Sequence, residues 1–320
     1  MKVVVTGGAG FLGQRLIREI LQRGELGDSR GERQRVDCVV AVDQVGTPGQ
    51  DRVQALVGDV GDAAFVREAV RGADSVFHLA AVVSGAAEAD FDLGMRVNLD
   101  GTRVLLEALR AEGRRPKVVF SSSVAVFGGT LPAVVDDSTT PMPQSSYGVQ
   151  KLIGELLVSD YSRKGFVDGR AVRLPTIVVR PGKPNAAASS FASGIIREPL
   201  AGVEAICPVD PETSMWVLSP AAAITNLLHA HELSSDAWAG PRSLSLPGIT
   251  VSVRAMLDAL ANVGGAAARD RVRMQPDPRI EAIVRTWPAR FDTARADAMG
   301  FVRDEDFESV VHGYAKEYVR

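Results

Sequence analysis

The sequence predicts an α/β fold in which a doubly wound parallel sheet is followed by a smaller C-terminal lobe. Three observations lead to this prediction. Short apolar runs alternate with helical patterns over the first 180 residues. These runs are continuously apolar, as expected for strands that are covered on both faces of a sheet. Beyond Pro181 the pattern changes to helices separated by connections rich in proline and glycine.

The composition of the 320-residue chain is that of an ordinary globular protein, with 46% hydrophobic and 23% charged residues and a formal net charge of −3. This mild acidity argues against a nucleic-acid partner. No apolar stretch reaches the roughly 20 residues needed to span a bilayer, and glycines interrupt the N-terminal apolar run too early for a signal peptide. The two cysteines, Cys38 and Cys207, do not form a disulfide framework. We therefore expect a cytoplasmic protein without a membrane partner, and we expect Cys38 to be a small buried residue of a strand.

The first half of the chain carries most of the predicted sheet. Strands are predicted at residues 2–6, 37–42, 53–57, 75–80, 117–122 and 170–174, and helices at 11–23, 62–71, 88–112 and 146–164. This alternation implies right-handed strand–helix–strand units. The charged, glycine-rich segment 24–36 is predicted to be a solvated loop inserted before the second strand.

The second half is predicted to be mainly helical. Helices are predicted at residues 189–199, 219–231, 251–263, 278–285 and 304–316. We expect a nucleotide-binding domain over residues 1–180. Residues 181–320 would form mainly a smaller substrate-binding lobe, with some segments returning to the first domain.

A glycine-rich turn, residues 6–13, joins the first predicted strand to the first predicted helix. It contains Gly7-x-x-Gly10-x-x-Gly13 and also a Gly-x-Gly-x-x-Gly string that starts at Gly8. Glycine lets the backbone turn tightly and approach a pyrophosphate, and the following helix N-terminus offers amide N–H groups to that anion. The strand–turn–helix setting supports a dinucleotide site of the Rossmann type. The expected cofactor contacts in this turn are Gly7, Gly10, Phe11, Leu12 and Gly13.

An acidic residue, Asp43, follows the second predicted strand and is expected to bind the adenosine ribose hydroxyls. It comes later than the usual ~20 residues after the glycine motif, and the inserted loop accounts for the delay. Gln44 and Val45 follow without an adjacent arginine for a 2′-phosphate, which favours NAD over NADP. Asp59 and Val60 are placed for the adenine edge, although Asp59 fits a helix N-cap equally well.

Tyr147 and Lys151 lie four residues apart in a predicted helix and so share one of its faces. The ammonium group of Lys151 would favour the phenolate, so the pKa of Tyr147 should fall from its ordinary value of about 10. Such a pair can deprotonate an alcohol. A hydroxyl cluster, Ser121 to Ser123, ends an upstream strand. The Tyr-x-x-x-Lys string alone also fits two surface residues, and the remaining motifs supply the context.

Taken together, these motifs resemble the extended short-chain dehydrogenase/reductase family, the group of nucleotide-sugar epimerases and dehydratases. The resemblance covers nearly the whole chain and includes, in order, the glycine turn, Asp59-Val60, residues 77–81, Asn98, residues 121–128 and the Tyr147/Lys151 pair.

The resemblance implies a role for each matching residue. Tyr147 would be the acid/base, and Lys151 would bind the nicotinamide ribose. Ser123 would bind the substrate hydroxyl, because the third serine of the cluster matches the family's catalytic serine. Asn98 would hold the active-site helix or a water. Further cofactor contacts are implied for Leu79, Ala80, Ala81, Pro175 and Thr176.

The chain departs from the nucleotide-sugar enzymes at three places. Phe127 replaces a tyrosine common in that motif, and Thr176 stands where sugar epimerases usually carry asparagine. Residues 213–216 lack the arginine with which those enzymes bind a nucleotide diphosphate, and a diphosphate needs fixed cationic donors.

A closer resemblance is to a subgroup of NAD-dependent sugar-acid dehydrogenases, which oxidise the C2 hydroxyl of a four-carbon acid. It rests on residues 81–85, 91–98 and above all 179–194. It implies NAD as the cofactor and oxidation of D-erythronate to 2-dehydro-D-erythronate. Candidate cations for the substrate carboxylate are Arg180, Lys183 and Arg197. Candidate substrate contacts overall are Ser84, Ser123, Tyr147, Arg180, Asn185 and Ser189, although Ser189 also fits the N-cap of the helix that follows it.

Two other functions remain open: a nucleotide-sugar 4-epimerase or dehydratase with tightly bound NAD, and a non-catalytic NAD(H)-binding redox sensor. A sensor would need none of Ser123, Tyr147 and Lys151. No metal site is expected, because His229 and His231 would lie on different faces of one helix. His78 is expected to be a hydrogen-bonded core residue.

The helices predicted near residues 95–109 and 146–164 are apolar over wide arcs. This pattern is consistent with a homodimer formed by paired helices, or with burial under the second lobe.

Overall fold

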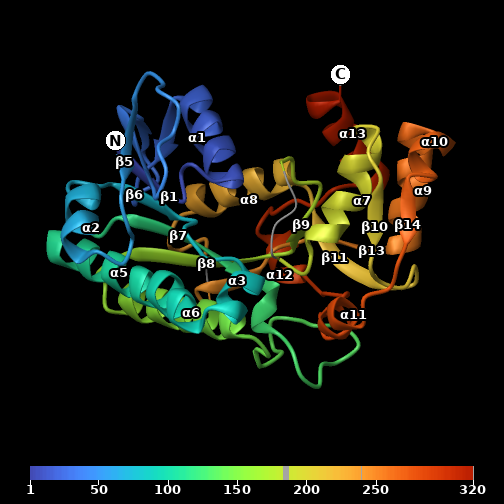
Figure 1. The fold of residues 1–320 in the computed structure, drawn as a ribbon. Helices are drawn as coiled ribbons and strands as arrows, with labels where there is room; N and C mark the ends of the chain where they lie inside the picture. The colour runs from blue at the N-terminus through green and yellow to red at the C-terminus, as the bar shows by residue number, and fades with distance from the viewer. Residues whose placement is uncertain (183–186, 239, 320) are drawn as a thin grey trace. The chain divides into compact units, whose positions relative to one another are not determined.

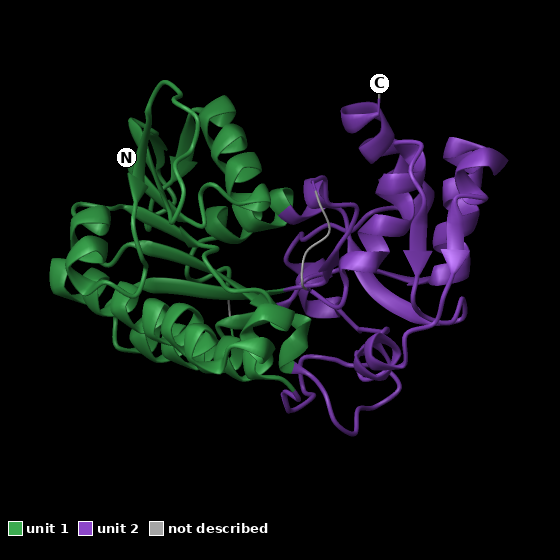
Figure 2. Ribbon diagram, viewed as in Figure 1, with its two compact units in different colours: residues 1–126, 145–173, 224–244 green, residues 127–144, 174–223, 245–320 purple. Residues whose placement is uncertain are grey.

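The computed structural model describes residues 1–182, 187–238 and 240–319. They form two compact units (Figure 2). The first contains residues 1–126, 145–173 and 224–244, and the second contains residues 127–144, 174–223 and 245–320. Residues 127–144 thus join the second unit although they lie early in the chain, and residues 224–244 return to the first.

A seven-stranded sheet with the strand order β12-β8-β7-β6-β1-β4-β5 forms the centre of the first unit. Strand β1 pairs in parallel with both β4 and β6, β4 pairs in parallel with β5, and β6 pairs in parallel with β7. The order runs outward from β1 in both directions, which confirms the predicted doubly wound parallel sheet. The strands are β1 (Lys2–Thr6), β4 (Cys38–Asp43), β5 (Val53–Val57), β6 (Ser75–His78), β7 (Lys117–Ser123), β8 (Asp168–Leu174) and β12 (Ser243–Ser245).

Helices cover both faces of this sheet (Figure 1). Apolar side chains of α2 (Ala63–Val70), α5 (Gly101–Glu112) and α6 (Ser146–Arg163) form one core with β1, β4, β6 and β7. The other face carries α1 (Phe11–Arg23) and α8 (Pro220–Glu232). Strands that are buried on both faces explain the continuous apolar runs of the sequence.

Three local predictions for the first unit are wrong. Segment 24–36 is not a plain loop, because it contains an antiparallel hairpin of β2 (Glu25–Gly27) and β3 (Arg33–Arg35) with Leu26 fully buried. Cys38 is half-buried, since it is the first residue of its strand. The helix predicted at 88–112 is interrupted. It is divided into α3 (Ser84–Ala89), α4 (Phe91–Gly94), the π-helix η1 (Met95–Asp100) and α5.

The interruption of that helix has a local cause. Asp90 has an extended backbone, and its side chain accepts a hydrogen bond from the N–H of Leu93 as the N-cap of α4. An N-cap ends one helix and starts the next. A π-helical turn then follows, a feature that is frequent at functional sites.

The second unit combines two small sheets with helices. Strand β11 (Ser214–Leu218) pairs in parallel with β9 (Thr176–Ile177) and in antiparallel with β13 (Ile249–Ser252), and β10 (Ala205–Cys207) pairs in parallel with β14 (Val272–Met274). These strands were not predicted, because each is only two to five residues long. The helices are α7 (Ser190–Leu200), α9 (Val253–Gly264), α10 (Ala266–Arg269), α11 (Pro278–Val284), α12 (Ala294–Ala298) and α13 (Phe307–Tyr318).

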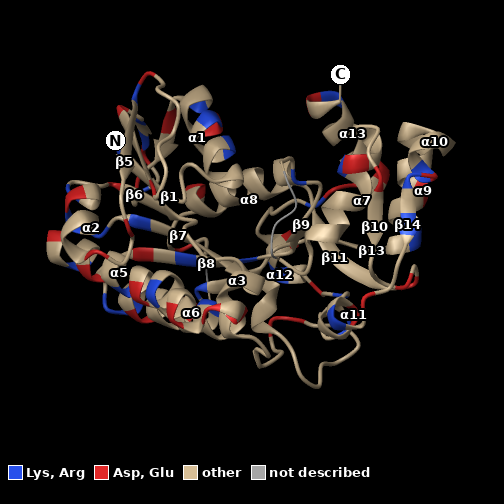
Figure 3. Cartoon of the chain, in the orientation of Figure 1, with Lys and Arg blue, Asp and Glu red and all other residues tan. Residues whose placement is uncertain are grey.

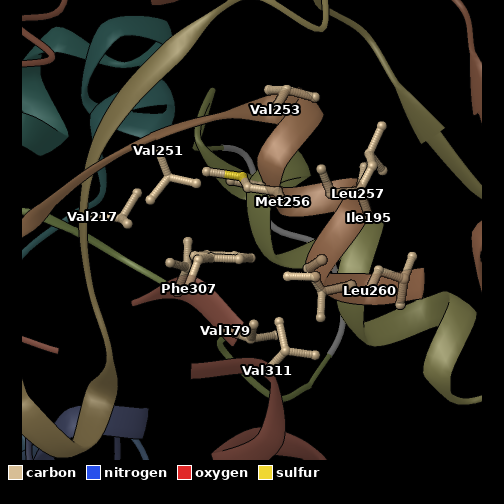
Figure 4. Packing of buried hydrophobic residues seen from close by; sticks show 14 of the residues in the cluster. Val179, Ile195, Val217, Val251, Val253, Met256, Leu257, Leu260, Phe307 and Val311 are labelled. Carbon is tan, nitrogen blue, oxygen red and sulfur yellow. The ribbon is translucent and has the colours of Figure 1, made fainter. Parts of the chain in front are cut away.

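The core of the second unit is formed by apolar side chains of α7, α9 and α13 and of strand β11 (Figure 4). Ile195 of α7, Leu260 of α9 and Val311 of α13 are all fully buried there. Close packing of this kind fixes the helices relative to the three-stranded sheet.

Acidic and basic residues are interspersed along the exposed helices rather than gathered by sign; α1 and α6, for example, carry both (Figure 3). In the part of the chain that the structure describes, no helix has the length and apolar character needed to cross a membrane.

Candidate active site

Helix α6 positions the predicted catalytic pair. Its N-cap is Ser145, whose hydroxyl accepts a hydrogen bond from the N–H of Gly148 at 3.2 Å. Tyr147 therefore lies in the first turn, and Lys151 lies one turn later on the same face. The Nζ atom of Lys151 is 5.7 Å from the centroid of the Tyr147 ring. The structure thus brings the two side chains together as the spacing predicts.

Lys151 is almost completely buried, with 2% of its surface exposed. Its Nζ donates to the carbonyl of Ser121 at 2.8 Å and lies 4.8 Å from the centroid of the Phe120 ring. Burial lowers the pKa of Lys151 to about 7, although the nearby Glu155 carboxylate partly opposes this shift. A cation held with so little water strongly favours an anion beside it, such as a phenolate.

The three serines at the end of β7 have different partners. Ser121 donates to the carbonyl of His78, and Ser122 donates to Glu155 at 2.5 Å. Ser123 is the last residue of the strand and is half-buried, and its oxygen accepts from the N–H of Ala125 at 3.1 Å. A hydroxyl that accepts one bond still has its own hydrogen to donate. Ser123 is therefore the serine best placed to bind a substrate hydroxyl.

Asn98 connects η1 to the segment that follows β6. Its Oδ1 accepts from the N–H of Val82 at 2.8 Å, and its Nδ2 donates to the carbonyl of Val82 at 3.1 Å. Nδ2 also donates to Oε1 of Gln150 on α6 at 2.8 Å. The predicted role of Asn98 in holding the active-site helix fits these contacts. Ser84, a candidate substrate contact, follows closely as the first residue of α3.

The glycine turn fits a dinucleotide. Gly7 has a φ of +73°, and a Cβ atom there would lie 2.9 Å from the N of Ala80, in the predicted cofactor segment Leu79 to Ala81. A Cβ atom on Gly13 would lie 2.1 Å from the carbonyl oxygen of Gly7. The N-cap of α1 is Gly10 and provides no side-chain cap. The first-turn amides, including those of the predicted contacts Phe11 and Leu12, are therefore available to a pyrophosphate.

Two predicted cofactor residues lie at the carboxyl ends of strands β4 and β5. Asp43 accepts from the N–H of Ala9 in the glycine turn at 3.0 Å and from that of Gln44 at 2.7 Å. Asp59 accepts from the N–H of Gly61 at 2.8 Å. The N-cap of α2 is Asp62, so the alternative interpretation of Asp59 as that cap is wrong. Val60, which directly follows Asp59, is 5% exposed and packs in the core.

The remaining predicted contacts belong to the second unit, except Asn185, which lies outside the described residues. Pro175 precedes β9, and Thr176 pairs with Val217 in that sheet. Ser189 stands at the N-cap position of α7 without a side-chain cap bond. The backbone N–H of Arg180 donates to Ser193 at 3.0 Å.

Arg197 is a weak candidate for the substrate carboxylate. It is 8% exposed, donates to the carbonyl of Arg180 at 2.7 Å and forms an ion pair with Glu198. Lys183, the other candidate cation of this segment besides Arg180, lies outside the described residues.

His78 is a hydrogen-bonded core residue, as predicted. Its ring nitrogens bond to the hydroxyls of Thr6 and Thr102 at 2.7 and 3.0 Å. Burial, with a smaller contribution from Lys151, lowers the pKa of His78 to about 3. Among the described residues, no three His, Cys, Asp or Glu side chains are grouped to hold a metal ion.

Sequence reasoning missed three buried polar residues around this site. Gln150 contacts Asn98, and Glu155 accepts a bidentate ion pair from Arg173 of β8. One signal was available: Glu155 follows Lys151 by four residues on a face that the apolar pattern assigns to the core. Polar residues on a buried face need partners, and these partners come from η1, β7 and β8.

The chain belongs to the NAD dependent epimerase/dehydratase family, whose sequence model matches residues 3–215. Among curated relatives, it is 55% identical over 320 residues to a protein of Cupriavidus necator named D-erythronate dehydrogenase, covering 99% of this chain and 98% of that protein. A protein of Haemophilus influenzae with the same name is 44% identical, with 98% of each chain covered.

A solved structure also matches the whole chain. It is described as the nucleoside-diphosphate-sugar epimerase from Agrobacterium tumefaciens and is 39% identical, with a TM-score of 0.94 and coverage of 100% of this chain and 94% of that one. An L-threonine dehydrogenase from Cupriavidus necator, 22% identical with a TM-score of 0.86 and 99% of each chain covered, shares the fold.

Proposed function

We propose that this protein is an NAD-dependent dehydrogenase that oxidises the C2 hydroxyl of D-erythronate to give 2-dehydro-D-erythronate. The observation that carries the proposal is the 55% identity over the whole chain to a relative with that named activity. The site supports it, because Ser123, Tyr147 and Lys151 lie around the end of β7 and the start of α6. A non-catalytic sensor would need none of these three residues.

The proposed mechanism assigns one task to each side chain. Ser123 holds the C2 hydroxyl by a hydrogen bond, and the Tyr147 phenolate takes its proton. Lys151 stabilises that phenolate from one turn further along α6. NAD, when bound, supplies the acceptor for the C2 hydride, so the products are a ketone, NADH and a proton. General-base assistance of this kind contributes roughly 10²–10⁴-fold to the rate.

The test is a spectrophotometric screen of four- to six-carbon sugar acids with NAD. We expect NADH to accumulate fastest with D-erythronate.

The second candidate function is that of a nucleotide-sugar epimerase, which the description of the Agrobacterium structure favours. That activity would convert a nucleotide sugar without net NADH. Conversion of this kind, with no NADH formed from any sugar acid, would reject the dehydrogenase proposal.

The preference for NAD is proposed to depend on Asp43. Its carboxylate lies beside the glycine turn, where it accepts from Ala9 at 3.0 Å, and it can also accept from ribose hydroxyls. In Asp43→Ala we expect the affinity for NAD to fall far more than that for NADP, measured by titration of each cofactor. Asp51→Ala changes a fully exposed aspartate and serves as the control. Equal losses for both cofactors would remove the ribose role of Asp43.

We also propose a homodimer formed through α5 and α6, in a cytoplasmic protein. On α6, Val149 and Leu156 are seven positions apart on one helix face and are 42% and 62% exposed, so this face offers apolar surface to a partner. Sedimentation velocity should give a dimer, and Leu156→Glu should shift it to monomer. A wild-type monomer would reject this assembly.

A further inference from the structure

Gln150 lies between Tyr147 and Lys151 on α6, and only 1% of its surface is exposed. Its Oε1 accepts a hydrogen bond from Nδ2 of Asn98 at 2.8 Å. The carboxamide of Asn98 is in turn oriented by both backbone groups of Val82. The orientation of each amide is therefore determined, because only the oxygen of Gln150 can accept from the nitrogen of Asn98.

The second half of the Gln150 amide is not satisfied. Its Nε2 is buried and has no hydrogen-bond partner among the described residues. A Cβ atom on Gly94 would lie 2.7 Å from this nitrogen, so the glycine provides the space that the amide occupies. A buried donor without a partner destabilises the folded protein. An apolar side chain of similar shape would remove this donor but would leave one N–H of Asn98 without its acceptor, so what the glutamine contributes here is the oxygen that orients Asn98.

These hydrogen bonds lead to the segment after β6, which includes the predicted cofactor contacts at residues 79–81. Val82 directly follows residues 79–81, and the backbone of Ala80 lies against Gly7 of the glycine turn. The carboxamide of Asn98 holds Val82 from the other side, and Gln150 holds that carboxamide. The segment 79–84 is thus fixed to the helix that carries Tyr147 and Lys151.

We propose that Gln150 is a positioning residue for hydride and proton transfer. By orienting Asn98, it sets the distance between the segment 79–84 and the Tyr147/Lys151 pair. The proposal rests on the proposed function for its kinetic consequence, but its structural consequence can be measured without any substrate. A misplacement of about 1 Å at a reacting centre can cost on the order of 10²-fold in rate.

The test uses Gln150→Met, which keeps the length of the side chain and removes the acceptor. We expect kcat with D-erythronate and NAD to fall by roughly 10²-fold. The melting temperature should change little, because the variant removes one unpaired donor, Nε2 of Gln150, and leaves another, one N–H of Asn98, without its acceptor. The backbone N–H of Val82 should exchange with deuterium faster in the variant, because its acceptor Asn98 is no longer oriented. Gln22→Met, at an exposed position of α1, is the matched control.

Two further variants keep the test decisive. Gln150→Glu retains acceptor oxygens for Asn98, so the N–H of Val82 should stay protected there even if Gln150→Met does not fold. In Asn98→Ala, the added Gln150→Met change should cause no further loss of kcat, because the two residues act through one contact.

The outcomes separate the two proposals. Slower turnover with faster exchange at Val82 supports the positioning role. Unchanged turnover in Gln150→Met, or slower turnover with Val82 as protected as in the wild type, overturns it. If the wild-type enzyme forms no NADH from D-erythronate, the proposed function fails, whereas exchange at Val82 still tests the contact chain.

Discussion

At the scale of single residues, the candidate site has one buried cation, Lys151, placed next to the phenol of Tyr147. Lys151 donates to the backbone carbonyl of Ser121, and among the described residues no carboxylate forms a salt bridge with it. The buried carboxylate of Glu155, which follows Lys151 by four residues on α6, is held by a bidentate ion pair with Arg173. The charge on Lys151 is thus available to Tyr147.

The role of Tyr147 as the base predicts a specific loss in Tyr147→Phe. Without the phenolic oxygen, kcat should fall by at least roughly 10²–10⁴-fold. Affinity for NAD should survive, as measured by titration of the purified protein. Tyr318→Phe, at an exposed position near the C-terminus, is the control. Turnover close to that of the wild type would exclude Tyr147 as the base.

The depressed pKa of Lys151 predicts how stability depends on pH. Burial lowers the pKa to about 7 in the folded protein from 10.5 in an unfolded chain. Between these values the unfolded chain binds more protons, so the free energy of unfolding rises with pH. Lys151→Met should lack this contribution between about pH 7 and 10. Denaturant titrations of both proteins across this range measure the difference, and identical slopes would contradict the prediction.

At the scale of secondary structure, the sequence reveals elements whose pattern is long and regular. The strand before the glycine turn and the helix after it were predicted at their observed positions, because a glycine-rich turn separates two clear periodicities. The π-helical turn around Asn98 could not be predicted, since Asn98 bonds to Val82, 16 positions earlier and outside the helix, and helical periodicity does not encode such a contact. The hairpin within segment 24–36 also depends on distant residues. The N–H of Gly27 donates to Glu232, about 205 positions later.

The residues of the candidate site also divide into those that local sequence patterns indicate and those that depend on contacts between distant parts of the chain. Residues in short motifs (Gly7, Gly13, Tyr147 and Lys151) could be singled out from their spacing together with the order of the motifs along the chain. Gln150 could not, because its contact to Asn98 joins two helical segments 52 residues apart. Nor could spacing identify a partner for the substrate carboxylate.

The close approach of Gly13, in the first turn of helix α1, to the glycine turn leads to a prediction about stability and cofactor binding. In Gly13→Ala the new Cβ atom would lie 2.1 Å from the carbonyl oxygen of Gly7, so the turn must move. We expect destabilisation of about 1–3 kcal/mol and a loss of NAD affinity. Gly313→Ala, in open space on α13, should instead stabilise the protein by about 0.5–1 kcal/mol. Thermal melts and NAD titrations measure both effects, and unchanged NAD affinity in Gly13→Ala would argue against the cofactor role of the turn.

At the scale of the first unit as a whole, one hydrogen-bond network connects the N-terminal parts of strands β6, β7 and β8 to the C-terminal end of helix α8. His231, fully buried, bonds to Ser75 at 2.7 Å and contacts Glu232 at 3.2 Å. The carbonyl of His231 accepts from Lys117 at 2.8 Å and from Arg170 at 3.0 Å. Strands β6, β7 and β8 are therefore tied to His231 of α8, which comes at least 61 positions after each residue that it contacts in these strands.

This network predicts sensitivity to acid. Burial lowers the pKa of His231 to about 4 from an ordinary value of 6.5. Below pH 6.5 the unfolded chain therefore binds a proton that the folded protein does not, so stability falls as the pH falls toward 4. His231→Gln should be less stable at pH 7 but should lose less on acidification from pH 7 to 5. The exposed His312→Gln is the control. Equal losses in His231→Gln and the wild type, measured by urea unfolding, would contradict this.

The return of the chain to the first unit has a consequence for synthesis. A nascent chain that has left the ribosome only as far as residue 180 already contains Lys117 and Arg170, both of which are fully buried in the finished protein. It does not yet contain the carbonyl of His231 that binds both cations, nor the edge strand β12. The first unit thus cannot complete its fold while the ribosome is still making the segment 181–244. Order of synthesis and order of folding are different in this protein. A gene cut at residue 180 would encode a sheet in which Lys117 and Arg170 both lack the His231 carbonyl, and Arg170 would keep only its ion pair with Asp168.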